Sequence, residues 1–150
     1  MREINGAKTQ SADVSGILDC KLIAVNKTDV YAIGGNKGTR TLLGKYKDWP
    51  KSCFKIDLGR GKFEKRGDMI QERLNFGICA IRHMIFVVGG RNEEKGDLST
   101  TERYDMLENK WTELPCSIKG GYTAGLTVVP AKNRYIYGFG LINNSDFSQE

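Results

Sequence analysis

The sequence has few of the residues and patterns that mark metal sites, catalytic centres or membrane anchors. It holds one histidine, His83, and its cysteines follow one another at intervals of 33, 26 and 37 residues, too far apart for a zinc site: Cys20, Cys53, Cys79 and Cys116. No apolar run approaches the length of a transmembrane helix, and the first residues lack the apolar core of a secretory signal. We therefore expect a cytoplasmic chain with reduced thiols, no cofactor or metal, and no membrane association.

Proline is also scarce, at three residues, whereas glycine is abundant, at 18 of 150 residues. This ratio is typical of chains with many short strands joined by tight turns. Apolar residues make up 39% of the chain and aromatic residues 9%, which is compatible with the packed core of one domain and not with disorder.

Positive charge is concentrated in the first half of the chain. Residues 1–75 carry 15 Lys/Arg against 9 Asp/Glu, whereas residues 76–150 carry 8 against 9. Such a concentration suits either a patch for an acidic partner or nucleic acid, or the solvated faces of edge strands and loops. We favour the solvated faces and expect no nucleic-acid partner. The basic residues concerned are Lys45, Lys47, Lys51, Lys55, Arg60, Lys62, Lys65 and Arg66.

A block of apolar residues that runs into two glycines occurs more than once. It reads Ile-Phe-Val-Val-Gly-Gly at 85–90 and Val-Tyr-Ala-Ile-Gly-Gly at 30–35, and a degraded copy reads Tyr-Ile-Tyr-Gly-Phe-Gly at 135–140. The apolar run predicts a strand buried on both faces. The two glycines allow a positive φ or the close approach of another backbone segment.

The first two copies share further residues downstream of the double glycine. Tyr104-Asp105 and, six residues on, Trp111 follow the copy at 85–90, and Ile56-Asp57 and Phe63 follow the other at the same spacing. A recurring Asp is expected to bind the backbone of the following turn rather than to form an acid pair for catalysis. The repeat positions are Gly34, Gly35, Ile56, Asp57, Phe63, Gly89, Gly90, Tyr104, Asp105, Trp111, Gly138 and Gly140.

This pattern, an apolar strand ending in Gly-Gly, then Tyr-Asp, then Trp as the sixth residue after the Asp, resembles the kelch repeat. The resemblance covers roughly residues 20–140 and is most specific in the second copy. It implies an all-β fold, a partial β-propeller of four-stranded antiparallel kelch-type blades. The alternative is an ordinary antiparallel sheet protein with a chance similarity.

The spacing of the repeats divides the chain into blades. We expect a flexible lead or the end of a preceding blade at 1–18, blade 1 at 19–68, blade 2 at 69–116, and an incomplete blade 3 with a tail at 117–150. Strands are expected at 21–25, 29–33, 52–57, 62–65, 75–81, 85–88, 99–104, 110–114, 123–129 and 135–139. We expect Pro115 to end its strand, and the segments 68–73 and 91–98 to be loops.

Two and a half blades leave two open ends, although kelch-type propellers close with more blades than this. The sequence is therefore expected to be a fragment, with a ring completed by several chains as the alternative. Open apolar faces and unpaired edges predict self-association of the isolated chain.

The resemblance implies a non-enzymatic module that binds a protein partner through loops on one propeller face, and by analogy a ubiquitin-ligase substrate adaptor or an actin-binding protein. The alternative is a fragment of a kelch-type enzyme whose catalytic residues lie in missing blades; a copper radical oxidase is excluded for the chain alone, because it needs several histidines. The candidate loops follow each double glycine and are the least constrained by strand pairing. Their candidate binding residues are Lys37, Arg40, Lys45, Tyr46, Arg91, Asn92, Glu93 and Asn143.

Overall fold

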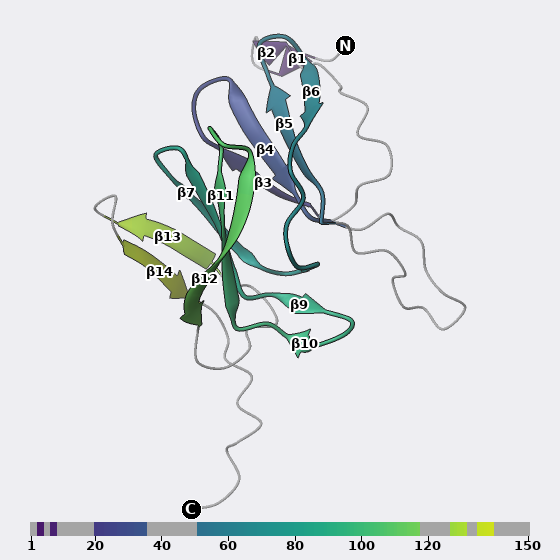
Figure 1. Cartoon of the computed structure of the whole chain (residues 1–150). Coiled ribbons are helices and arrows are strands. Elements are labelled where there is room, and N and C mark those ends of the chain that lie inside the picture. Colours follow the sequence, from purple (N-terminus) through teal and green to yellow (C-terminus); the bar gives the residue numbers. More distant parts are fainter. Residues whose placement is uncertain are drawn as a thin grey trace, which may run out of the picture.

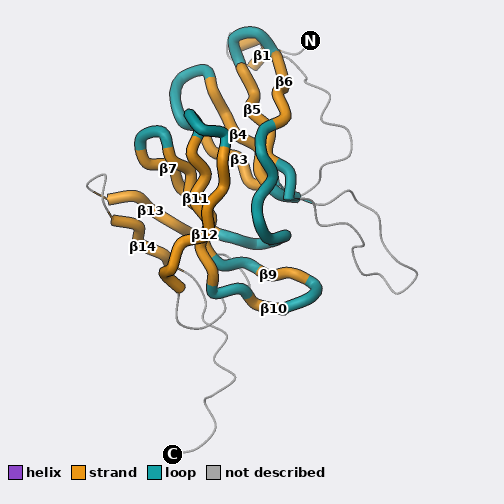
Figure 2. Tube along the Cα trace, viewed as in Figure 1, coloured by secondary structure: helices purple, strands orange, loops and turns teal. Residues whose placement is uncertain are grey.

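The structure is a computed structural model that describes residues 3–4, 7–8, 20–35, 51–117, 127–131 and 135–139. Every regular element in these residues is a β-strand (Figures 1 and 2). Fourteen strands form two four-stranded sheets and three two-stranded ones, all antiparallel. The expected fold class, a partial β-propeller of four-stranded antiparallel blades, is confirmed.

Blade 1 is a meander in which each strand pairs with the next one along the chain. Its strands are β3 (Lys21–Ala24), β4 (Asp29–Ile33), β5 (Cys53–Asp57) and β6 (Lys62–Lys65). The turn between β3 and β4 is closed by Asn26, whose Oδ1 accepts hydrogen bonds from the amides of Thr28 and Asp29.

Blade 2 repeats the same strand order. Its strands are β7 (Gly77–Ile81), β8 (Met84–Val88), β11 (Thr100–Asp105) and β12 (Lys110–Ser117). The double glycine ends β8, and Tyr104 of β11 lies opposite both Ile85 and Trp111. A further hairpin, β13 (Thr127–Ala131) and β14 (Tyr135–Phe139), packs β13 against β7.

Two short hairpins complete the described strands. One is β1 (Glu3–Ile4) with β2 (Ala7–Lys8), and the other is β9 (Arg91–Asn92) with β10 (Gly96–Asp97). The second corrects our expectation of a plain loop at 91–98. Strand signals are weak there because the segment is charged, and its turn is held instead by an Asn side chain.

Two other expected boundaries are wrong. Pro115 lies within β12 instead of ending it, because the pairing with β11 shifts register between Thr100 and Thr101 and so leaves the proline at an irregularity in an outer strand. The first strand of blade 2 begins at Gly77 rather than at Asn75, whose φ of 55° is incompatible with a strand. Residues 68–73 contain no strand or helix, as expected of a crossing loop.

The main core lies between the two blades. Tyr31, Ile33 and Cys53 of blade 1 face Ile85 and Val87 of blade 2, and all five side chains are buried. The remaining buried members of this core are Met69, Phe76, Tyr104 and Trp111. On the opposite face of β8, Val88 packs with Cys79 and with Val128 of β13. Strand β8 is thus buried on both faces, which is why its sequence is continuously apolar.

Aromatic rings and their polar atoms join the outer parts of the blades. The rings of Tyr31 and Tyr104 meet edge to face at 5.9 Å, and Trp111, only 7% exposed, donates from Nε1 to the carbonyl oxygen of Gly67 at 2.7 Å. The hydroxyl of Tyr104 accepts a hydrogen bond from Arg66 and donates one to Asn109. Trp111 is thus buried where blade 2 meets the segment that follows blade 1.

The other face of blade 1 is also apolar, and no described blade stacks on it. The register places its side chains in two cross-strand rows: Leu22, Ala32 and Phe54, and Val30, Ile56 and Phe63. Leu22 is 61% exposed, and Phe63 is only half-buried although it occupies the position of Trp111. We call these six residues the open face of blade 1.

Candidate functional site

The double glycines create the space in which the crossing segment between the blades can pass. All four glycines have positive φ, from 62° to 105°. A Cβ on Gly90 would lie 2.6 Å from the carbonyl oxygen of Leu74, and a Cβ on Gly34 would lie 2.9 Å from the ring of Phe76. Phe76 therefore packs against the glycines of both blades, and any larger residue would displace it.

The repeated aspartates hold the turns at the other end of the blades. Oδ1 of Asp105 accepts hydrogen bonds from the amides of Leu107 and Glu108, and Oδ1 of Asp57 accepts one from the amide of Arg60. The pKa of Asp105 is lowered chiefly by the hydrogen bond from the amide of Glu108, and further by that from Leu107. His83, in the turn between β7 and β8, lies 3.9 Å from the Asp105 carboxylate. These residues serve the turns.

A buried ion pair fixes the crossing segment to blade 2. Arg73 and Glu102 are both fully buried, and Nη2 of Arg73 lies 2.7 Å from Oε1 of Glu102. Arg73 also donates from Nη1 to the carbonyl oxygens of Gly89 and Thr100. The Glu102 carboxylate accepts hydrogen bonds from the amides of Ile70 and Gln71. The two charges thus bind four backbone groups, of which only the Thr100 carbonyl also has a backbone partner, the amide of Gly89.

The β9–β10 hairpin is anchored at its base and in its turn. Arg91 and Leu74 exchange two backbone hydrogen bonds, of 2.8 and 2.9 Å, and the amide of Leu98 donates to the carbonyl oxygen of Gly90. Asn92 is buried, and its Oδ1 accepts a hydrogen bond from the amide of Lys95 at 2.7 Å. The hairpin that follows the double glycine is therefore a defined structure, continuous with the crossing segment.

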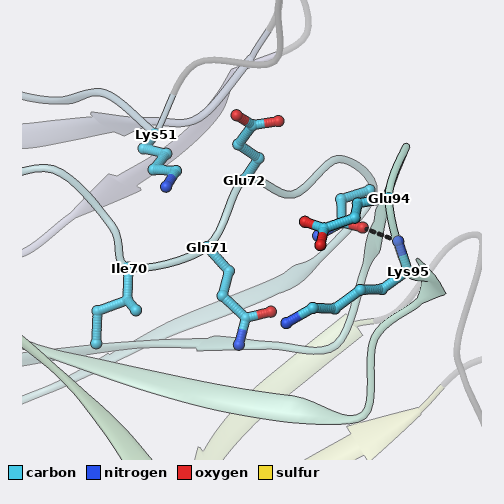
Figure 3. A pocket seen from close by; sticks show the side chains of 7 residues that line it. Lys51, Ile70, Gln71, Glu72, Glu94 and Lys95 are labelled. Atoms are coloured by element: carbon cyan, nitrogen blue, oxygen red, sulfur yellow. Dashed lines mark hydrogen bonds between the residues drawn. The ribbon is translucent and has the colours of Figure 1, made fainter.

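A groove of about 330 Å³ opens between the crossing segment, the hairpin and the start of β5 (Figure 3). Its lining residues are Lys51, Ile70, Gln71, Glu72, Asn92, Glu94 and Lys95. The amide of Met69 donates to the carbonyl oxygen of Lys51, which ties the start of β5 to the crossing segment. All three walls are therefore held by hydrogen bonds before anything binds.

The charged side chains of this groove are unpaired in the part of the chain that the structure describes. Neither Lys51 nor Lys95, and neither Glu72 nor Glu94, lies within 4.0 Å of an opposite charge there. Gln71 donates from Nε2 to Glu113 at 2.6 Å, while its Oε1 is buried and accepts no hydrogen bond. A rigid groove with unused charges of both signs and an unused acceptor is suited to recognising polar side chains.

The structure places the expected binding residues unevenly. Arg91, Asn92 and Glu93 lie in the β9–β10 hairpin, but Asn92 is used internally and only its neighbours are exposed. Lys37, Arg40, Lys45, Tyr46 and Asn143, and Gly140 of the third repeat, lie outside the described residues. The binding assignments of Arg91 and Glu93 stay predictions.

Most of the residues that line the groove are not expected from the sequence. Ile70, Gln71 and Glu72 belong to the crossing segment, which is expected only to connect the blades. Lys51 is among the residues expected on a solvated face. The groove cannot be recognised in the sequence because its walls are far apart in the chain. They meet only after β4 pairs with β5 and Leu74 pairs with Arg91. Glu94 and Lys95 lie inside the expected loop, and only their charge distinguishes them.

The thiols of Cys53 and Cys79 lie in the core and outside the groove. Burial raises the pKa of Cys53 to about 12 and that of Cys79 to about 11. Both are therefore protonated at neutral pH, and neither forms a disulfide. Among the described residues, none belongs to a helix long and apolar enough to cross a membrane.

Comparison with known sequences finds one matching family model and several relatives. Residues 72–117 match the family model described as Kelch motif. Kelch-like protein 36 of Rattus norvegicus is 35% identical over 85 residues, which are 57% of this chain and 11% of that protein. Beta-scruin of Limulus polyphemus is 27% identical over 85 residues, 57% of this chain and 9% of that protein.

A viral protein matches a longer part of the chain. Kelch repeat and BTB domain-containing protein 2 of Cowpox virus (strain GRI-90 / Grishak) is 29% identical over 113 residues, which are 62% of this chain and 18% of that protein. The chain thus spans less than a fifth of the length of these relatives. The solved structure of YjhT is similar over 82% of this chain and 34% of that one, with a TM-score of 0.62 and 15% identity, which is a likeness of fold. The resemblance to the kelch repeat is confirmed.

Proposed function

We propose that this chain, of which residues 72–117 match the Kelch motif, is a non-enzymatic module that binds a protein partner at the double-glycine end of its blades. The observation that carries the proposal is the groove, whose three walls are held by hydrogen bonds while its four charges stay unpaired among the described residues. Because the backbone of the walls is already held by hydrogen bonds, a partner that pairs with these charges has to order only their side chains.

The kinds of partner are part of the proposal. The resemblance implies either recruitment of a substrate for a ubiquitin ligase or contact with actin, and the relatives include a protein whose name joins kelch repeats to a BTB domain. We propose a cytoplasmic location as well, because the Cys53 and Cys79 thiols are reduced and buried.

Photocrosslinking tests the proposal even while the partner is unidentified. A photoreactive phenylalanine analogue replaces Glu94 at the groove and, in a matched control, Arg60 in the turn between β5 and β6, where the side chain is 84% exposed. Illumination in cells is expected to give a discrete protein adduct from position 94 and none from position 60. The Lys51→Glu and Lys95→Glu double variant is expected to lose that adduct.

Two outcomes contradict the proposal. Identical adducts from positions 94 and 60 would show that contact is not specific to the groove end. Absence of any adduct from position 94, with the protein intact and folded by circular dichroism, would show that this end of the blades does not bind a protein in the cell.

A further inference from the structure

We infer that the groove selects an extended polypeptide segment that carries a basic side chain and an acidic side chain close together. This inference rests on the proposed function and specifies the chemistry of the partner. It follows from an unused acceptor on Gln71, two unused carboxylates and two unused ammonium groups around one hollow (Figure 3).

The acceptor on Gln71 calls for a hydrogen-bond donor. The orientation of its carboxamide is fixed, because Nε2 donates to the Glu113 carboxylate at 2.6 Å. Oε1 is consequently the atom left over, and it is buried without a hydrogen bond. Figure 3 shows the carboxamide directed toward the end of the Lys95 side chain, although no hydrogen bond joins them. A buried acceptor of this kind gains from any ligand that donates to it.

The two carboxylates of the groove favour a donor that is positively charged. Glu72 comes from the crossing segment and Glu94 from the hairpin, so they approach the groove from different walls. Neither forms an ion pair among the described residues. A guanidinium or ammonium group in the groove would meet a neutral acceptor and carboxylates together, and Arg in particular offers several donors to such a set.

The two lysines require that the ligand also carry negative charge. Lys51 and Lys95 line the same hollow and have no carboxylate partner within 4.0 Å in the described part of the chain. A purely basic segment would be repelled by them, and a purely acidic segment or a nucleic acid would be repelled by Glu72 and Glu94. The complement of the groove is therefore a segment of mixed charge.

Buried hydrogen bonds fix the backbone of the crossing segment where it lines the groove. The amides of Ile70 and Gln71 are bound by the buried Glu102, which Arg73 neutralises. The volume of about 330 Å³ lies near the lower limit for ligand pockets, so only a few side chains of a partner enter it. The rest of the segment lies across the open rim.

Fluorescent decapeptides with a glycine-serine background test the inference on the whole chain. Four peptides carry one Arg and one Glu two positions apart, two Arg, two Glu, or no charge, and anisotropy reports binding. The mixed peptide is expected to bind most tightly. Two double variants are each expected to weaken binding of the mixed peptide about tenfold, as loss of two exposed charge contacts implies. One combines Glu72→Gln with Glu94→Gln, and the other combines Lys51→Gln with Lys95→Gln.

Further variants separate recognition from folding. Arg60→Gln in the turn between β5 and β6, combined with Lys62→Gln at the first residue of β6, removes two exposed charges remote from the groove and is expected to leave binding unchanged. Gln71→Leu is expected to reduce the preference for the mixed peptide over the doubly acidic one. The melting temperature of each variant shows whether it still folds. If Gln71→Leu is unstable, the two double variants that neutralise surface charges still test the charge requirement of the groove.

The outcomes distinguish this inference from the proposed function. Equal binding of all four peptides, tightest binding of the doubly acidic peptide, or tighter binding of a ten-nucleotide thymidine strand would each overturn the inference. If position 94 still captures a protein by photocrosslinking, the proposed function stands and only the charge assignment fails. If neither peptides nor crosslinking report contact, both fail.

Discussion

Removal of the Arg73–Glu102 pair is expected to be costly even when both charges are removed together. A simple buried ion pair is often replaceable by apolar residues of similar volume with little loss of stability, whereas removal of one partner alone costs about 3–5 kcal/mol. Here each charge also binds backbone. Glu102 accepts from the amides of Ile70 and Gln71, and Arg73 donates to the carbonyls of Gly89 and Thr100.

The magnitude follows from those backbone groups. Glu102→Leu alone leaves a buried guanidinium without its counter-charge, and it is expected to lower the free energy of unfolding by about 3–5 kcal/mol. Arg73→Met with Glu102→Leu removes both charges and leaves the amides of Ile70 and Gln71 and the carbonyl of Gly89 without partners, whereas the carbonyl of Thr100 still accepts from the Gly89 amide. At about 1 kcal/mol each, the lower limit for an unsatisfied buried group, the double variant still loses about 3 kcal/mol. Domains of this size have about 5–15 kcal/mol in total, so each variant is near the limit of folding.

Urea unfolding followed by far-ultraviolet circular dichroism measures these variants. The expected result is that the double variant is no more than about 2 kcal/mol better than Glu102→Leu. Recovery of the double variant to the stability of the parent chain would refute the reasoning, because it would show that these backbone groups find water or other partners. Glu102→Gln, which keeps the volume and one acceptor but not the charge, separates loss of the charge from loss of the volume.

Four other expectations follow from the packing. Trp111→Ala should lower the free energy of unfolding by about 3–5 kcal/mol and Phe63→Ala by about half as much, because Phe63 is only half-buried; equal losses in urea unfolding would show that Phe63 is covered as fully as Trp111. Gly90→Ala should cost about 1–3 kcal/mol more than Gly96→Ala, since both have positive φ but only the former meets a backbone oxygen, at 2.6 Å; equal melting temperatures would show that the crossing segment shifts freely. Burial raises the pKa of Cys53 to about 12 from 9.0, so its contribution is full below pH 9 and is lost as the pH rises toward 12; Cys53→Ala should flatten that decline, and an unchanged slope between about pH 8 and about pH 11 would count against a buried thiol. The isolated chain should self-associate through the open face of blade 1, and light scattering that shows a monomer across a concentration series would mean that this face is covered.

The fold can be predicted from the sequence because its strongest signals repeat. Ile-Phe-Val-Val-Gly-Gly marks a strand that is apolar on both faces, and a second copy at fixed spacing makes coincidence improbable. Trp111 is expected in the core since a large aromatic at a repeated position serves packing between repeats, and it is buried there. Asp105 is expected to hold the following turn, and its carboxylate does so. In each case one local pattern determines one local structure.

The buried ion pair and the groove cannot be predicted in the same way. Arg73 and Glu102 are 29 residues apart, and charged side chains in a crossing segment and a strand are ordinarily solvated. Their burial follows from the path of residues 70–76 beneath the double glycine, which depends on tertiary packing. The hairpin at 91–97 escapes prediction for a related reason, because its turn is held by one buried Asn rather than by apolar alternation.

The difference between the two blades explains why the groove forms where it does. With the repeats aligned on Asp57 and Asp105, the position of Glu102 in blade 2 is occupied by Phe54 in blade 1. Phe54 belongs to the open face, so blade 1 has no carboxylate there to bind the amides of an incoming segment. A buried carboxylate therefore fixes the crossing segment to blade 2, and the hydrogen bond from the Met69 amide to the Lys51 carbonyl ties it to the chain before β5. The residue at this one strand position thus distinguishes the blade that presents the polar groove from the blade whose equivalent position lies on an apolar face.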